Sequence, residues 1–137
     1  MLKRISLLVI IVILAACSSG EIQPVDIEAN DMCSFCRMAI SEKQFAAEII
    51  EENEAVLKFD DIGCMLRYRK ASGDSLKVAA TFVTDHETRK WIPAENAFFT
   101  RSESVRTPMG SGIVAYTNDQ SAGPNALRFD DLTTETK

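Results

Sequence analysis

The chain has 137 residues, of which 46% are hydrophobic, and a formal net charge of −5. This length fits one domain with a buried core. The acidic balance excludes the electrostatic docking by which basic proteins bind nucleic acid or anionic lipid. A single histidine and the lack of a glycine-rich phosphate loop leave no recognisable hydrolytic or nucleotide-binding motif, so we do not expect an enzyme. The four cysteines and five methionines are the residues that remain to be explained.

Residues 1–16 are expected to form a lipoprotein signal peptide. Lys3 and Arg4 precede an apolar run at 5–14. This run has about ten residues, whereas a membrane-spanning helix needs roughly 20. The letters LAAC that end at Cys17 form a lipobox. Cleavage before this cysteine in a bacterial cell would leave it lipidated and facing the periplasm; an uncleaved signal anchor is the alternative reading.

Residues 17–30 are expected to form a lipidated tether, and residues 31–137 the domain. Ser18 and Ser19 favour the outer membrane, by resemblance to sorted lipoproteins. Two of the 15 basic residues lie in the leader, so the mature chain would carry 13 basic and 20 acidic residues, a formal charge of −7. Such a charge makes the lipid the expected membrane attachment.

The domain pattern predicts an α+β fold. Apolar stretches at 46–50 and 55–59 predict a β-hairpin, and a helix is expected at 62–70 with Asp60 and Asp61 before it as capping residues. The pattern then predicts a strand at 77–83, a returning strand at 88–92, a short helical or extended segment at 94–99, a polar loop at 101–106 and a last strand at 112–117, with a loose tail beyond it. Strands and helices do not alternate as in a parallel α/β fold.

The stretch CSFCRM contains Cys33, Cys36 and Met38. With Cys17 lipidated, an odd number of cysteines remains in an oxidising compartment, so at least one thiol has no partner within the chain. A C-x-x-C pair alone is compatible with a redox dithiol, and also with a zinc site completed by scattered ligands.

Met38 favours a third interpretation. It follows Cys36 by two residues, so in an extended segment both side chains project to one face. A thiolate and a thioether are soft ligands and select Cu(I). Met109 lies between a proline and glycines in the loop TPMGSG at 107–112, a position that suits presentation of a second thioether.

Several other residues are weaker candidates. Cys64 is expected to be a buried apolar residue of the helix, and Asp60-Asp61 to cap that helix rather than to react. His86 is expected to be exposed in a turn, although its imidazole could complete a site. Met32 is either a supplementary ligand or part of the tether, and Trp91 is expected in the core.

Four motifs in order resemble the NosL family of copper-binding accessory lipoproteins. They are MCSFCRM at 32–38, FDDIGCMLRY at 59–68, WIPAENAFF at 91–99 and TPMGSGIVAY at 107–116. The resemblance implies a Cu(I) chaperone that helps to build the copper–sulfur cluster of nitrous-oxide reductase, together with an ABC-type maturation complex. It also implies a single small domain of two strand–strand–helix–strand units, similar in architecture to part of the organomercurial lyases.

The resemblance assigns metal-binding roles to particular residues. Cys36 and Met38 match the family's Cys-x-Met element, Met109 matches its Pro-Met-Gly loop, and Cys33 matches the first cysteine of the motif. Arg37 stands where a small residue such as glycine is common. The alternatives are a lipid-anchored thiol–disulfide oxidoreductase using Cys33 and Cys36, a cysteine-based lyase, or copper delivery to another enzyme such as cytochrome oxidase.

Overall fold

A computed structural model describes residues 20–135; the expected signal peptide and the lipobox cysteine Cys17 lie outside the described residues. The strands are β1 (Ala47–Glu51), β2 (Val56–Phe59), β3 (Val78–Thr84), β4 (Trp91–Pro93), β5 (Phe98–Arg101) and β6 (Ile113–Tyr116). The helices are α1 (Ile62–Ser72), α2 (Asp119–Ala122) and α3 (Phe129–Glu135), and three short 3-10 turns lie at Lys43–Phe45, Gly73–Ser75 and Ala94–Asn96. Among the described residues, no helix is long and apolar enough to cross a membrane.

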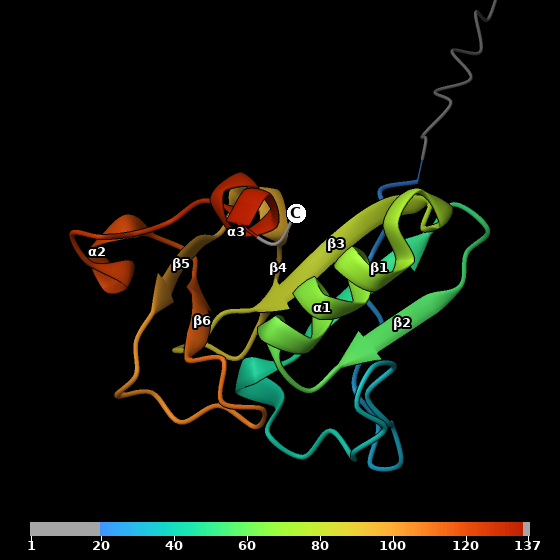
Figure 1. Ribbon diagram of the computed structural model, residues 1–137, viewed down its shortest axis with the longest axis horizontal. Coiled ribbons are helices and arrows are strands. Elements are labelled where there is room, and N and C mark those ends of the chain that lie inside the picture. The colour runs from blue at the N-terminus through green and yellow to red at the C-terminus, as the bar shows by residue number, and fades with distance from the viewer. Residues whose placement is uncertain (1–19, 136–137) are drawn as a thin grey trace, which may run out of the picture.

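A four-stranded antiparallel sheet, in the order β2-β1-β3-β4, forms the larger part of the domain. Helix α1 lies across one face of this sheet (Figure 1). Strand β1 occupies a central position, and its first four residues are all buried, which explains the apolar character of its Ile49-Ile50 pair. The order β1–β2–α1–β3 is the strand–strand–helix–strand unit expected from the sequence.

A smaller unit repeats this order in reduced form. Strands β5 and β6 form an antiparallel hairpin, α2 follows, and Leu127 then pairs with Phe99 of β5. The backbone amides of Phe99 and Leu127 donate to each other's carbonyls at 2.9 and 2.8 Å. The expected α+β class with two such units is therefore confirmed.

The segment after β6 differs from the expected loose tail. It contains helices α2 and α3, and Phe129 of α3 packs against Phe99 with ring centroids 6.0 Å apart. Leu132 of the same helix is fully buried. The sequence FDDLTTE is too polar to reveal this helix by periodicity, because only two of its residues enter the core.

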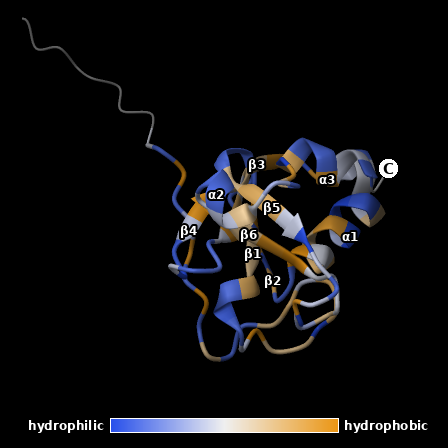
Figure 2. Ribbon diagram, turned by 90° about the vertical axis from the view of Figure 1, so that its left-hand side faces the viewer, coloured by the Kyte–Doolittle hydropathy of each residue, from blue (hydrophilic) through white to orange (hydrophobic). Residues whose placement is uncertain are grey.

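The described part of the expected tether packs on the domain. Ile27 is only 4% exposed, and the Val25 amide donates to the Glu48 carboxylate at 2.9 Å. The Lys58 ammonium reaches the Asp26 carbonyl at 2.6 Å. Figure 2 shows this segment running beside β4. The packed domain therefore begins several residues before Asp31.

Candidate metal centre

Three thiols and one carboxylate converge at one end of the sheet. Ligand atoms of Cys33, Cys36, Asp60 and Cys64 all lie within 4.8 Å of one another. Cys33 and Cys64 are fully buried and Asp60 is nearly so, whereas Cys36 is half-buried. We call these four residues the cysteine cluster. It has one accessible side, at Cys36.

The loop that carries the first two cysteines folds back on itself. Met32 pairs with Ala39, and the Cys33 amide donates to the Met38 carbonyl at 2.8 Å. The Arg37 amide donates to the Cys33 carbonyl at 3.0 Å, which closes the turn around Cys36. These bonds place both thiols of the C-x-x-C motif on the inner side of one tight turn.

Strand β2 holds this loop in place. The Ser34 amide donates to the Lys58 carbonyl at 2.7 Å, and the Lys58 ammonium forms a 2.6 Å ion pair with Asp31. The hydrogen bond from Lys58 lowers the pKa of Asp31. Because β2 ends at Phe59, the same strand delivers Asp60 and the start of α1 to the cluster.

Arg37 adopts a left-handed backbone conformation, with φ of 65°. Residues other than glycine pay roughly 1–2 kcal/mol there because Cβ approaches the following carbonyl oxygen. The conformation gives a physical reason why a small residue such as glycine would suit this position. With arginine at this position the turn still forms, but its backbone is strained.

The Asp60 carboxylate is incompletely satisfied. The Cys36 thiol donates to its Oδ2 at 3.4 Å, while its Oδ1 is buried and has no hydrogen-bond partner among the described residues. An unpaired buried carboxylate oxygen is costly, and a cation bound between it and the thiols would satisfy it. The donor set therefore fits a metal ion.

Burial favours the protonated form of two of the thiols while no cation is bound. It raises the pKa of Cys36, and it raises the pKa of Cys64 strongly. The ligand form of cysteine is the thiolate, so a metal must displace protons when it binds. Metal capture at this cluster is thereby coupled to proton release.

Met109 lies on a loop that is tied to the base of the cluster. The Asp61 carboxylate caps α1 by accepting the Gly63 amide at 2.6 Å, and its other oxygen accepts the Met109 amide at 3.0 Å. The Ser111 hydroxyl donates to Asp61 at 2.5 Å. Asp61, the neighbour of Asp60 in sequence, thus joins the Pro-Met-Gly loop to the start of the helix.

The structure brings together only part of the predicted ligand set. Cys33 and Cys36 lie in the cluster, Met109 is partly buried against the core, and Met38 is 57% exposed. Ligation of metal by either methionine stays a prediction. Met32 is likewise exposed, at 51%.

Sequence reasoning missed Cys64 and Asp60 as partners in the site. Cys64 is buried as expected, but beside two other thiols rather than among apolar residues alone. Of the acidic pair, only Asp61 caps the helix. The available signal was the odd number of cysteines, which left one thiol without an assigned role.

His86 lies in a turn, as expected from the sequence, but it is half-buried rather than exposed. Its ring packs between Phe45 and Tyr116, at centroid distances of 5.3 and 6.0 Å. Its Nδ1 is buried and has no hydrogen-bond partner among the described residues. It lies outside the cysteine cluster. Trp91 is half-buried and packs against the core, in line with expectation.

The fold and the cluster define a small α+β protein with a thiol-rich candidate metal centre. A family model for NosL matches residues 24–135, so the chain belongs to the NosL family. Membership of this family agrees with the expectation of a protein that is not an enzyme.

A solved structure supports the same fold. The copper chaperone NosL from Shewanella denitrificans superposes with a TM-score of 0.72 at 22% sequence identity, covering 82% of this chain and 97% of that chain. At this identity the likeness establishes the architecture. A search of curated proteins finds no match.

Proposed function

We propose that this protein carries Cu(I) as cargo at the cysteine cluster and delivers it for assembly of the copper–sulfur cluster of nitrous-oxide reductase. The observation that carries the proposal is the convergence of three thiols within 4.8 Å, one of them accessible. Thiolates are soft ligands that select Cu(I) over hard cations. Family membership supports copper as the cargo.

The burial pattern suits a carrier that must also release its metal. Cys33 and Cys64 would hold Cu(I) from inside the domain, while Cys36 can be reached by an incoming ligand. A metal-binding atom of the receiving protein would bind Cu(I) before a cysteine of the cluster dissociates, so no free ion is released. Met38, exposed on the same loop, and Met109 are proposed as supplementary thioether ligands.

The proposed setting is the periplasmic face of the cell envelope. Cys17 would carry the lipid that attaches the protein to the membrane, with the outer membrane favoured by Ser18 and Ser19. The proposed partners are nitrous-oxide reductase and the ABC-type complex of its maturation. The net negative charge supports attachment through the lipid rather than through surface charge.

The cluster is a poor fit to a thiol–disulfide oxidoreductase. Such enzymes expose a cysteine with a lowered pKa. Here burial raises the pKa of Cys36, and its motif partner Cys33 is fully buried. Zinc is a stronger competitor because three thiolates and a carboxylate can surround it tetrahedrally. A competition between Cu(I) and zinc for the purified protein separates these two ions.

Delivery is tested in cells that assemble nitrous-oxide reductase. In a strain lacking this protein, we expect the purified reductase to lack its copper–sulfur cluster although its polypeptide is still produced. Restoration by the wild-type chain and by Lys70→Gln, but not by Cys36→Ser, supports delivery through this cluster. Lys70 is exposed on α1 and serves as the matched control. A fully loaded reductase in the deletion strain would contradict the proposal.

A further inference from the structure

A pocket of ≈ 290 Å³ lies between the N-terminal segment and the start of β4. None of its lining residues belongs to the cysteine cluster. The lining combines three cations, one carboxylate and the indole of the chain's single tryptophan: Asp26, Ile27, Lys43, Thr84, Arg89, Lys90 and Trp91. Such a concentration of positive charge is unusual for a chain with a net charge of −5.

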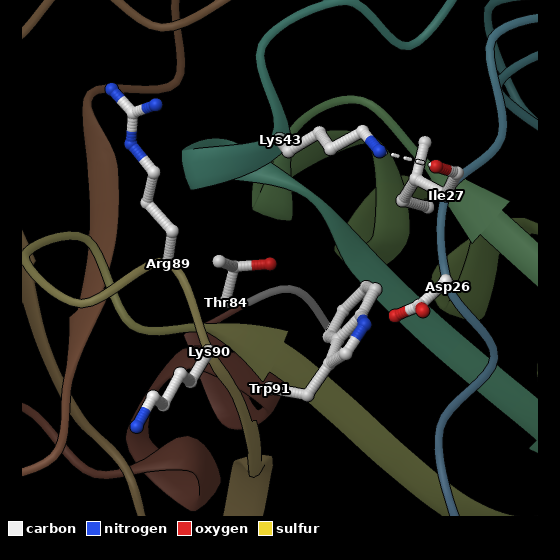
Figure 3. A pocket seen from close by; sticks show the side chains of 7 residues that line it. All are labelled: Asp26, Ile27, Lys43, Thr84, Arg89, Lys90 and Trp91. Atoms are coloured by element: carbon white, nitrogen blue, oxygen red, sulfur yellow. Dashed lines mark hydrogen bonds between the residues drawn. The ribbon is translucent and has the colours of Figure 1, made fainter.

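The Asp26 carboxylate and the Arg89 guanidinium lie on different sides of the pocket. Figure 3 shows the Asp26 carboxylate beside Trp91, with Arg89 on the far side of the pocket. The Lys43 ammonium donates to the Ile27 carbonyl at 2.5 Å, on the side of the pocket where Asp26 lies (Figure 3). Within the part of the chain that the structure describes, neither the Asp26 carboxylate nor the Arg89 guanidinium has a hydrogen bond or ion pair with another residue. Both charged groups are therefore available to a ligand.

The turn that presents Arg89 is rigid. The Asp85 carboxylate accepts the amides of Glu87 and Thr88 at 2.9 and 2.7 Å. The Arg89 amide donates to the Asp85 carbonyl at 2.8 Å, and φ at Arg89 is 59°, a left-handed conformation that favours glycine. These bonds fix the backbone from which the Arg89 side chain extends.

We propose that this pocket binds the zwitterionic headgroup of an aminophospholipid, of the phosphoethanolamine class. The headgroup's ammonium would lie against the Trp91 ring and the Asp26 carboxylate, where cation–π and ionic attraction act together. Its phosphate would lie at Arg89, because a guanidinium binds phosphate with paired hydrogen bonds. A headgroup without the ammonium would leave Asp26 facing a negative charge.

The position of the pocket in the chain favours a lipid as the source. Asp26 is nine residues after Cys17, so the pocket can lie at most about 30 Å from a lipid attached there. Tryptophan and basic side chains both suit the water–membrane interface. The choice of a membrane lipid as the source of the headgroup rests on the lipid anchor of the proposed function. It does not depend on copper.

Trp91 provides a direct reporter because no other tryptophan contributes to the signal. We would titrate the lipidated, full mature protein in maltoside micelles with glycerophosphoethanolamine, following Trp91 fluorescence and its indole N–H resonance. We expect saturable changes in both. Asp26→Asn and Arg89→Gly should each weaken binding by about fivefold or more, as expected for loss of a charge-assisted contact. Lys70→Gln should leave it unchanged.

Parallel arms separate the sources of the ligand. Binding of inorganic phosphate or of ethanolamine alone as tightly as glycerophosphoethanolamine would overturn the zwitterion assignment. In vesicles of phosphatidylglycerol with and without phosphatidylethanolamine, we expect the Trp91 emission to shift only when phosphatidylethanolamine is present. Headgroup binding in micelles with no difference between these vesicles would overturn the membrane source. Cu(I) affinity measured on the same samples keeps failure of this proposal distinct from failure of copper binding.

Discussion

Cys36 is the residue through which the cluster would both take up and release a metal. Its thiol donates to Asp60 at 3.4 Å from inside the cluster, yet the side chain is only half-buried. The other two thiols are inaccessible to a partner protein. An acceptor that takes the metal must therefore approach at Cys36.

Replacement of Cys36 by serine should remove tight Cu(I) binding. We expect the affinity to fall by more than about 100-fold, beyond the loss typical of residues that only orient ligands. Met109→Leu and Met38→Leu, which keep the apolar volume, should weaken binding less. Anaerobic competition with a chromophoric Cu(I) chelator measures these affinities. Unchanged affinity in Cys36→Ser and Met109→Leu would contradict the assignment.

Cys64 should matter as much as Cys36, although the sequence predicted only a core role for it. Cys64→Ala keeps a small apolar side chain in the helix and should fold, with loss of Cu(I) affinity similar to that of Cys36→Ser. Circular dichroism and thermal unfolding check the fold, and the same chelator competition checks binding. A folded Cys64→Ala protein with wild-type affinity would exclude Cys64 from the site.

Arg37 allows the strain in the cysteine loop to be tested. Arg37→Gly relieves the left-handed backbone and should leave Cu(I) affinity intact with no loss of stability. Arg37→Val should destabilise the protein by about 1–2 kcal/mol, because a branched side chain is least tolerated at positive φ. Urea unfolding compares the two variants. Equal stability of both would show that the turn relaxes in solution.

At the scale of elements, the contact between α1 and the 107–112 loop sets the position of Met109. Asp61 bonds to both, and the two meet so closely that a Cβ on Gly63 would lie 2.5 Å from Ser111 Cβ. No side chain fits at position 63 without moving one of the two. Glycine is required here by close approach rather than by its dihedral freedom.

Gly63→Ala should therefore push the Met109 loop away from the helix. We expect a loss of about 1–3 kcal/mol in the free energy of unfolding, typical of overpacking. Cu(I) affinity should fall as far as in Met109→Leu, because displacement of the loop carries the Met109 thioether away from the site. Gly20→Ala is the matched control, since nothing lies within 4 Å of a Cβ at that position. A Gly63→Ala protein that is destabilised but keeps wild-type Cu(I) affinity would show that the 107–112 loop does not contribute to metal binding.

The 85–90 turn makes stability depend on pH. Burial alone would raise the pKa of Asp85, but hydrogen bonds from Thr117 and Thr88 outweigh it and hold the pKa at about 2, below the ordinary 3.8. A lowered folded-state pKa contributes stability above pH 3.8 that is lost as the pH falls towards 2. The difference corresponds to about 2 kcal/mol.

Urea unfolding at pH 7, 4, 3 and 2 tests this contribution. The free energy of unfolding of the wild type should fall by about 2 kcal/mol more than that of Asp85→Asn between pH 4 and pH 2. Asp74→Asn, at an exposed carboxylate without a hydrogen bond or ion pair among the described residues, is the control and should follow the wild type. Parallel pH curves for all three proteins would contradict the role of Asp85.

At the scale of the molecule, the strands and helix up to β6 were more predictable from the sequence than the C-terminal helices. The hairpin β1–β2, helix α1 and strands β3 and β6 have clear hydrophobic patterns, because each presents several side chains to one core. Helix α3 contributes only Phe129 and Leu132, so its pattern is too short to recognise. Its position is decided by tertiary packing, which local sequence does not encode.

The site was only half predictable for a related reason. The C-x-x-C spacing and the nearby methionines mark the 31–40 loop, because their chemistry is local in sequence. Cys64 and Asp60 reach the same place only because β2 pairs with β1 and α1 then starts above the loop. A buried cysteine in a helix has the same sequence pattern whether or not other thiols lie beside it.

The central claim is that one Cu(I) ion binds among the cluster's thiols. Anaerobic titration of the apoprotein with Cu(I), followed by X-ray absorption on the loaded protein, tests it most directly. We predict one ion per chain, a first shell of two or three sulfur atoms with no requirement for nitrogen, and loss of this signal in Cys36→Ser. A nitrogen- or oxygen-dominated shell, or an unchanged spectrum in Cys36→Ser, would contradict the account.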